Sequence, residues 1–224
     1  MTGECARRPL VIAVDGPSAA GKGTLGRSLA RHFGLAFLDT GLLYRAVGVS
    51  LIEDGLSLDD PEAATAAAQL LCLDTLNQID LRGRMAGEAA SRVAVHPGVR
   101  AALLKLQRDF ASQPGGAVLD GRDIGTVIAP DAEVKIYVTA SPEVRAERRW
   151  KQLVGLGESV AYEDVLADIR KRDERDGGRD AAPMTQAEGA ELLDTTLMDI
   201  EAATDAARRI VEAARAGAPK GADG

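Results

Sequence analysis

Aromatic residues and cysteines are scarce in this chain of 224 residues, and a long apolar run is missing. Phe, Tyr and Trp make up only 3% of the sequence, so the core must be built from Leu, Ile, Val and Ala. Alanine favours helices, which argues against an all-β fold. Cys5 and Cys72 stand in no metal-ligand or redox spacing. We therefore expect no disulfide framework and a reducing, cytoplasmic environment.

The sequence also has little that would suit a nucleic-acid binder or a membrane protein. Its formal net charge of −7 argues against a general nucleic-acid binder, which needs a basic surface. The first ten residues contain no apolar signal segment, and no apolar run approaches the ~18 residues of a transmembrane helix. We expect a cytoplasmic monomer with neither nucleic acid nor membrane as partner. Small anionic substrates are compatible with the charge, since a site can be locally basic in an acidic protein.

Short apolar runs alternate with helical patterns along the chain, which is typical of a parallel sheet with crossover helices. The leucine and phenylalanine spacing in 24–33 predicts one amphipathic helix, and a closing helix is expected at 199–214. Ser141 and Pro142 have the character of a helix N-cap and first helical residue. The prediction is an α/β fold with a five-stranded parallel sheet flanked by helices. The expected strands are 10–14, 36–38, 117–119, 134–138 and 192–193.

This pattern predicts a single domain over residues 1–215, whose core comprises 8–45, 117–147 and 184–215. Residues 46–116 are mostly Ala/Leu helix, and residues 148–183 mix arginines densely with acidic residues. Inserts of this kind usually lie above the carboxyl edge of the sheet, where ligands bind. We expect 46–116 to be an acceptor-binding insert and 148–183 a lid. The tail 216–224 is small and polar and is expected to be disordered.

The stretch from Gly16 to Thr24, GPSAAGKGT, follows the first expected strand and opens a helix, as a Walker A loop does. Small residues let backbone N–H groups surround phosphate oxygens, and Lys22 supplies a mobile charge near the β–γ bridge. The alternative is a strand–helix corner whose glycines serve only a tight turn. The presence of Lys22 and the position of the loop between a strand and a helix argue against it. The pattern predicts a P-loop NTPase fold with ATP bound by Gly16, Pro17, Ser18, Ala19, Ala20, Gly21, Lys22, Gly23 and Thr24.

Arginines stand where two facing nucleotides would need cations. Unopposed phosphate charges ~4 Å apart repel by about 4 kcal/mol per pair at an intermediate dielectric, and arginine binds phosphate bidentately. Arg45 and Arg122 follow expected strands, whereas a late cluster contains Arg148, Arg149, Arg172, Arg175 and Arg179. The alternative for this cluster is a solvated helix face with weak ion pairs. The glycine pair 177–178 favours a site role for Arg172 and Arg179, whereas plain surface is expected for Arg145, Arg170, Arg208, Arg209 and Arg215.

Three carboxylates accompany these cations. Asp120 ends a buried strand, the usual place of a Walker B acid, and is predicted to orient Mg²⁺ through water. Asp15 precedes the loop and has a structural alternative, accepting backbone donors at the turn. Asp39 is either a helix N-cap or a site residue. Trp150 is expected to pack in a core in preference to stacking on adenine.

These pieces together resemble the bacterial-type cytidylate kinases, one family of the P-loop nucleoside monophosphate kinases. The form GKGT is itself typical of nucleoside monophosphate kinases, which hold Mg²⁺ more through water and nucleotide oxygens than through a loop hydroxyl. The resemblance spans nearly the whole chain in order and is most specific in DTGLLYR and DGRDIGTV. The other matching pieces are IAVDGPSAAGKGTLGRSLA, EAASRVAVHPGVRAALLKLQR, PDAEVKIYVTASPEVRAERR, IRKRDERDGGRDAAP and LLDTTLMDIE.

The resemblance implies that ATP, with Mg²⁺, phosphorylates CMP and also dCMP. It implies that the acceptor phosphate is bound by Thr40, Arg45, Arg122 and Arg179. It places the cytosine at Ser91, Arg100 and Asp123, the ribose at Arg172 and Asp176, and Tyr44 against the nucleotide. The implied catalytic set is Lys22, Arg122, Arg148, Arg149 and Arg179.

Base selection follows from the chemistry of these residue types. Cytosine presents a 4-amino donor where uracil presents an oxygen, so a carboxylate at Asp123 favours cytosine. One departure is a shortened insert, because only Cys72–Asp80 precedes LRGRMAGEAASRVA here, where longer members carry a β-rich segment. The alternatives are a UMP/CMP or AMP kinase, and a P-loop ATPase module that hydrolyses ATP without an acceptor nucleotide.

Overall fold

The computed structural model describes residues 9–73, 76, 81–179 and 182–217. Its centre is a five-stranded parallel sheet in the order β2-β3-β1-β4-β5, which confirms the predicted α/β fold. Each expected strand is present and differs from its predicted bounds by one or two residues. The strands are β1 (Val11–Asp15), β2 (Ala36–Asp39), β3 (Ala117–Gly121), β4 (Val134–Thr139) and β5 (Glu191–Asp194).

Strand β1 lies at the middle of the sheet, hydrogen-bonded to β3 on one side and β4 on the other. Along β1, Ile12 and Val14 face α1 (Lys22–Phe33) and α8 (Ile200–Gly217), which together cover one face of the sheet. Ala13 faces the opposite layer, as the two-residue alternation of a strand requires. Because the strand order reverses at β1, a crevice opens at its carboxyl end, where ligands bind in open α/β sheets.

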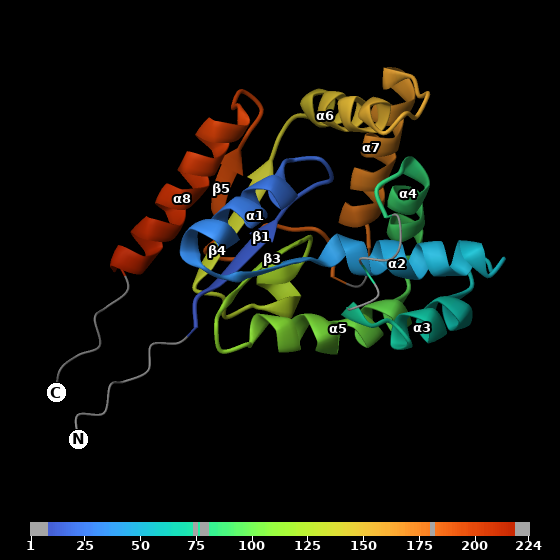
Figure 1. Ribbon diagram of the computed structural model, residues 1–224, viewed down its shortest axis with the longest axis horizontal. Helices are drawn as coiled ribbons and strands as arrows, with labels where there is room; N and C mark the ends of the chain where they lie inside the picture. The colour runs from blue at the N-terminus through green and yellow to red at the C-terminus, as the bar shows by residue number, and fades with distance from the viewer. Residues whose placement is uncertain (1–8, 74–75, 77–80, 180–181, 218–224) are drawn as a thin grey trace.

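Four helices gather at one end of the sheet and build a second core (Figure 1). This layer contains no strand among the residues described, and its buried side chains include Leu43, Val47, Val93 and Leu103. Helix α2 passes through residue 46 without a break, so the expected edge of the insert falls inside a helix. The helices are α2 (Thr40–Glu53), α3 (Pro61–Gln69), α4 (Arg84–Val93) and α5 (Pro97–Ala111).

Helices α6 (Pro142–Gly155) and α7 (Tyr162–Gly177) pack on each other, and α7 lies beside α4 (Figure 1). The Ser141 hydroxyl accepts from the Val144 N–H and caps α6, as predicted. Trp150 packs in the α6–α7 core and donates to the Val160 carbonyl at 3.0 Å, which confirms its packing role.

Several expectations concern residues beyond the described ranges. Cys5, most of Cys72–Asp80 and residues 218–224 of the tail lie outside them, while residues 216 and 217 end helix α8. Among the described residues, no helix combines the length and the apolar character needed to cross a bilayer.

Candidate active site

The glycine-rich loop follows β1 and leads into α1, so the predicted strand–loop–helix context is present. Gly16 has φ of +140°, and a Cβ there would lie 1.9 Å from the Val138 carbonyl oxygen on β4. No other residue fits this close approach. A Cβ on Gly23 would lie 3.3 Å from Asp120 Oδ2, so a bulkier residue after Lys22 would crowd the carboxylate. The close approach of β4 thus selects Gly16, whereas the side chains of Arg27 and Asp120 leave little room at Gly23.

Lys22 is buried inside this loop. Its Nζ donates to the Pro17 carbonyl at 2.8 Å and lies 3.8 Å from Asp120 Oδ1. Burial lowers the pKa of the Lys22 ammonium, and the positive charge of Arg122 lowers it further. Burial likewise raises the pKa of Asp120, although Lys22 opposes that change. Burial therefore works against the charged form of both groups. A bound phosphate would give the Lys22 ammonium a further negative partner.

A cavity of about 910 Å³ opens over the loop and the carboxyl ends of β1 and β3. The sheet contributes Asp39 and Asp120, α2 contributes Arg45, and α6 and α7 contribute further arginines. Six of the predicted cations line this one cavity: Lys22, Arg45, Arg122, Arg148, Arg149 and Arg172. The cavity is large enough for a nucleotide, whose typical site volume is ~300–1,000 Å³.

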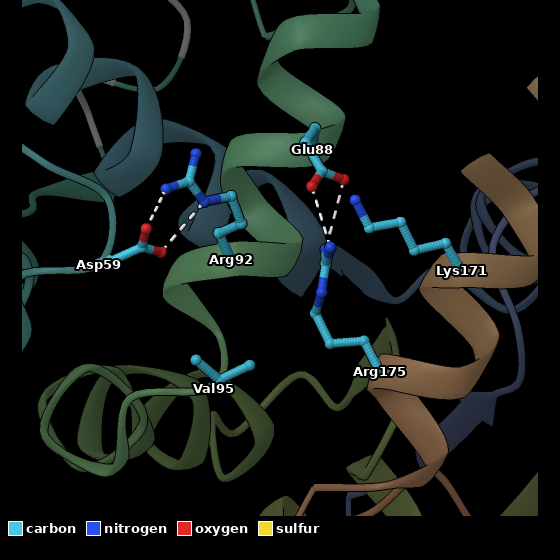
Figure 2. Close-up of a pocket in the computed structure, with 6 residues that line it drawn as sticks. All are labelled: Asp59, Glu88, Arg92, Val95, Lys171 and Arg175. Atoms are coloured by element: carbon cyan, nitrogen blue, oxygen red, sulfur yellow. Dashed lines mark hydrogen bonds and ion pairs between the residues drawn. The ribbon is translucent and has the colours of Figure 1, made fainter. Parts of the chain in front are cut away.

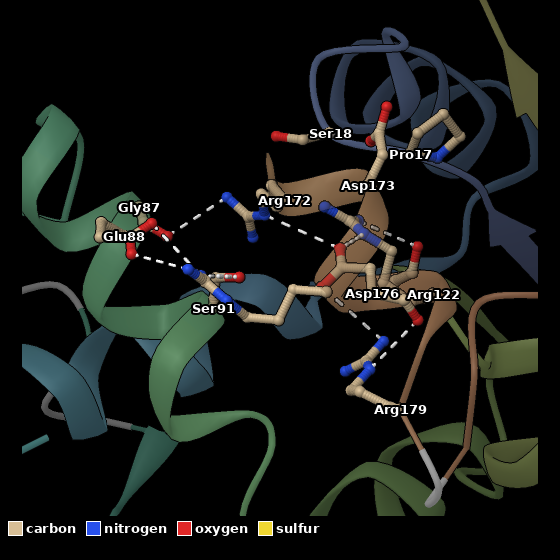
Figure 3. A network of polar contacts seen from close by, with 12 residues as sticks. Pro17, Ser18, Gly87, Glu88, Ser91, Arg122, Arg172, Asp173, Asp176 and Arg179 are labelled. Atoms are coloured by element: carbon tan, nitrogen blue, oxygen red, sulfur yellow. Dashed lines mark hydrogen bonds and ion pairs between the residues drawn. The ribbon is translucent and has the colours of Figure 1, made fainter. Parts of the chain in front are cut away.

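Asp176 on α7 is the centre of a buried cluster of three arginines (Figure 3). Arg122 Nε donates to Asp176 Oδ2 at 2.9 Å, Arg172 Nε lies 3.8 Å from the same oxygen, and Arg179 Nη2 lies 3.9 Å from Oδ1. Within the described part of the chain, Arg172 Nε and Arg179 Nη2 find no hydrogen-bond partner. Buried donors of this kind normally have partners, so the cluster is suited to receive an anion.

The pKa values of two arginines in the cluster are lowered, whereas burial of Arg122 is outweighed by Asp176, Asp120 and Asp39, which raise its pKa. Burial first, and then the neighbouring Arg122, lower the pKa of Arg172 to about 9. Burial also lowers the pKa of Arg179, although Asp176 opposes the change. One carboxylate does not neutralise three guanidinium groups.

Of the remaining predicted phosphate ligands, Arg45, Arg148 and Arg149 line the same cavity, whereas Thr40 and Arg179 are not among its lining residues. The Thr40 hydroxyl donates to the Asp120 carbonyl at 2.8 Å, and Arg45 Nη1 donates to the Leu81 carbonyl at 2.6 Å. Arg148 Nη1 donates to the Thr195 hydroxyl at 2.9 Å, which anchors it beside the loop. Arg149 Nη2 donates to the Gly83 carbonyl at 3.0 Å and so connects α6 with the start of α4.

The three residues expected to read a base lie on separate elements. Arg100 on α5 forms a buried ion pair with Asp123 and lies over the Tyr44 ring, 5.8 Å from its centroid. Asp123 directly precedes a short π-helical segment, η2 (Ile124–Ile128). Ser91 is buried on α4 and bonds to Arg175 on α7. Arg100, Tyr44 and Asp123 thus form one contact group, and Ser91 belongs to the seam between α4 and α7.

Asp15 links the loop to the segment after β3. Its two carboxylate oxygens accept from the Ile124 and Gly125 N–H groups, each at 2.7 Å. The structural prediction for Asp15 is confirmed, but the donors belong to η2 and not to the phosphate loop. Burial raises the pKa of Asp15 to about 6 against the opposing effect of these hydrogen bonds. Asp39 caps α2 by accepting from the Gly41 N–H and also lines the cavity, so it combines both alternatives.

One prediction was wrong: Arg145 is buried, not a surface residue. It forms a bidentate pair with Asp173 at 3.0 and 2.6 Å and donates to the Ser18 carbonyl at 3.3 Å. It therefore connects α7 with the phosphate loop. The sequence reasoning also missed Glu88 and gave no role to Arg175. The spacing of Glu88 three residues before Ser91 on one helix face was the available signal.

The fold and the glycine-rich loop define the class first: this is a P-loop phosphotransferase. Its architecture is similar to that of a shikimate kinase from Bacteroides thetaiotaomicron, with a TM-score of 0.51 at 16% identity over 91% of this chain and 98% of that one. An uncharacterized protein from Eubacterium ventriosum aligns with a TM-score of 0.54 at 13% identity, over 92% of this chain and 99% of that one. These two likenesses concern the fold alone.

The sequence comparisons are far closer. The family model described as cytidylate kinase matches residues 12–214. The cytidylate kinase of Caulobacter vibrioides (strain NA1000 / CB15N) is 68% identical, with 92% of this chain and 97% of that protein covered. Those of Xanthobacter autotrophicus and Brucella suis are 63% and 52% identical, each over 93% of this chain and over 100% and 95% of their own lengths. The chain belongs to the cytidylate kinase family.

Proposed function

We propose that this protein transfers the γ-phosphoryl group of ATP to CMP, and also to dCMP, giving ADP and the corresponding diphosphate. The observation that supports this most directly is one cavity lined by Lys22 and by arginines from α2, α6, α7 and the end of β3. A phosphoryl transfer between two nucleotides needs this many cations, since both reactants are anionic. Membership of the family supports CMP as the acceptor.

In the proposed reaction the loop from Gly16 to Thr24 binds the donor phosphates through its backbone N–H groups and the N-terminus of α1. Lys22 stabilises the charge that develops at the β–γ bridge and on the transferred group. Arg148 and Arg149 approach that group from α6. Water must be kept from the site, because it would otherwise accept the phosphoryl group.

The acceptor phosphate is assigned to Thr40, Arg45, Arg122 and Arg179, and its ribose to Arg172 and Asp176. The unpartnered donors of Arg172 and Arg179 support this assignment, since an anionic ligand would supply their missing acceptors. The acceptor phosphate is already largely ionised near neutral pH, so no general base is required. Arg122 orients the attacking oxygen for in-line displacement.

The cytosine is assigned to Ser91, Arg100 and Asp123, with Tyr44 packed beside it. Asp123 accepts from the 4-amino group, and Arg100 donates to the O2 side of the ring. Because Arg100 and Asp123 already form a buried pair, they are preorganised as donor and acceptor. Uracil would place an oxygen opposite the Asp123 carboxylate and would be disfavoured.

The donor set at the cavity also fits Mg²⁺ when ATP brings it. Mg²⁺ prefers oxygen ligands and usually binds through one or two carboxylates, substrate phosphates and water. Asp120 and Asp39 both line the cavity, and the described residues contain no cluster of three or more metal-ligating side chains. Bound there, the ion would neutralise the β- and γ-phosphate oxygens, and Asp120 would orient it through water.

The test is steady-state phosphorylation with CMP, dCMP, UMP and AMP as acceptors, together with ATP hydrolysis in their absence. We expect CMP to have the highest kcat/KM and hydrolysis to stay low until CMP is added. Faster turnover of UMP or AMP would identify a kinase of another specificity. ATP hydrolysis that is unaffected by any acceptor would identify an ATPase module.

A further inference from the structure

The Ser91 hydroxyl is hydrogen-bonded to a side chain that can only donate. Arg175 Nη1 on α7 lies 2.7 Å from Ser91 Oγ on α4. A guanidinium group can only donate hydrogen bonds. Ser91 Oγ therefore acts as the acceptor in this contact, and its own hydrogen must point away from Arg175.

Glu88 fixes the guanidinium group of Arg175 in this position. The two oxygens of Glu88 accept from Arg175 Nη2 at 2.9 Å and from Nη1 at 3.3 Å, a bidentate arrangement (Figure 2). Glu88 and Ser91 are three residues apart on α4, so the helix itself sets the distance between them. On its outer side the pair faces a cavity of about 340 Å³ that is also lined by Asp59, Arg92, Val95 and Lys171.

A second contact restricts where the hydroxyl hydrogen can go. A helical serine often donates back to the carbonyl four residues earlier, which here is Gly87. That carbonyl accepts the Ser91 N–H within α4, as the helix requires, and also accepts from Arg172 Nη1 at 3.3 Å (Figure 3). Both lone pairs of the Gly87 oxygen are then engaged, and among the described residues the Ser91 hydroxyl has no acceptor of its own, so its hydrogen is available to a ligand.

We infer that Arg175 is a positioning residue that holds the Ser91 hydroxyl as a hydrogen-bond donor toward the pyrimidine ring and thereby favours cytosine over uracil. Cytosine has a lone pair at N3, whereas uracil has a hydrogen there. A serine hydroxyl held as a donor forms a hydrogen bond to N3 of cytosine. With uracil, its hydrogen would meet the hydrogen on N3 instead of an acceptor. This inference rests on the proposed CMP kinase activity and on the contact of Ser91 with the base.

The first test replaces Arg175 with Met and measures kcat/KM for CMP and for UMP. We expect the CMP/UMP ratio to fall about tenfold, the worth of one well-made hydrogen bond, because the hydroxyl can then rotate and accept from uracil. The KM for ATP should stay within about twofold of the wild type, since the donor loop is untouched. Arg175→Lys retains a donor-only group and should restore most of the ratio. Glu88→Gln keeps Arg175 but holds it less firmly, and should give a smaller fall.

The second test asks whether Arg175 acts through Ser91. Ser91→Ala should lower the CMP/UMP ratio, and adding Arg175→Met to it should lower the ratio no further. Arg170→Met, on the same helix but paired with Glu143 at the surface, is the matched control and should leave the ratio unchanged. Thermal unfolding checks that each variant is folded.

Two outcomes would overturn the inference while leaving the proposed function intact. One is an unchanged CMP/UMP ratio in Arg175→Met, and the other is a further, additive loss in the double variant. If Arg175→Met does not fold, Glu88→Gln takes its place, and an unchanged CMP/UMP ratio in that variant overturns the inference. A wild-type enzyme that does not prefer CMP would remove the proposed function and the inference together.

Discussion

The donor side and the acceptor side of the cavity are built on different principles. The donor loop rests on the central strand, and neighbouring backbone fixes its geometry, as the approach of Gly16 to the Val138 carbonyl shows. The acceptor side is largely helical, and side-chain pairs between elements position its polar groups, among them Arg122 after β3 with Asp176 on α7, and Arg175 with Glu88. Backbone N–H groups suffice to bind phosphate, which every nucleotide carries. Reading a base takes side chains, since only they differ in donor and acceptor pattern.

The largest expected effect concerns the donor side. Lys22→Met should lower kcat for transfer to CMP by about 10³-fold, because a preorganised cation at the transferred group is lost. The measurement is a steady-state rate with CMP and ATP at saturation. Lys105→Met, at an exposed lysine on α5, is the control and should be near wild type. A Lys22→Met enzyme with more than a tenth of the wild-type kcat would show that the backbone of the loop alone supports transfer.

The next largest effect is expected at Arg122, which lies between the donor side and the acceptor side. Arg122→Met should reduce kcat/KM for CMP by about 10²-fold, through loss of the bidentate phosphate ligand and of the partner of Asp176. Breaking a buried ion pair typically costs ~3–5 kcal/mol, so urea denaturation should also give a lower free energy of unfolding. Arg108→Met, on the outer surface of α5, should change neither quantity. If CMP turnover were preserved, the acceptor phosphate would have to bind elsewhere.

A smaller effect is expected from the acceptor side alone. Asp123→Ala should lower the CMP/UMP ratio of kcat/KM values by about tenfold while leaving the KM for ATP nearly unchanged. The loss arises because the carboxylate that accepts from the 4-amino group is gone. Competition assays with both monophosphates measure the ratio directly. A ratio equal to that of the wild type would exclude Asp123 as a base-reading residue.

The smallest effect concerns Asp15, which joins the two sides. Its folded-state pKa of about 6 lies above its ordinary value of 3.8, so the folded state binds more protons between these values. This contribution to stability is complete below about pH 4 and is lost as the pH rises through 6. From pH 5 to pH 7.5 it should decline by about 1 kcal/mol in the wild type but not in Asp15→Asn. Urea denaturation of both proteins at the two pH values tests this, and parallel profiles would refute it.

The sheet and the phosphate loop were predictable because their signals are local. Apolar runs such as 10–14 indicate burial directly, and a glycine-rich loop after a strand has few other uses. Arg145 was not predictable, because an arginine among acidic residues on a helix has the same local pattern whether it is solvated or buried. Its burial depends on α6 packing against α7 and bringing Asp173 to it.

The contact between Arg175 and Ser91 was unpredictable for a related reason. The two residues are 84 positions apart, and nothing in either local sequence specifies that α4 and α7 lie side by side. The pairing of Arg172 with Asp176 is different, since their spacing of four residues places them on one side of α7, whereas Arg179 lies beyond the end of that helix. Helical spacing therefore accounts for this pair, but not for Arg179 or for the partners on other elements.

The three guanidinium groups around Asp176 have a consequence for the lifetime of the protein itself. Their mutual repulsion opposes folding, and Asp176, the carboxylate that they share, offsets it only in part. An acceptor nucleotide that brings its phosphate there relieves the repulsion and binds only the folded chain, so its free energy of binding adds to that of folding. Resistance to unfolding should thus rise and fall with the supply of acceptor, and starvation for that nucleotide would leave the protein more exposed to proteolysis.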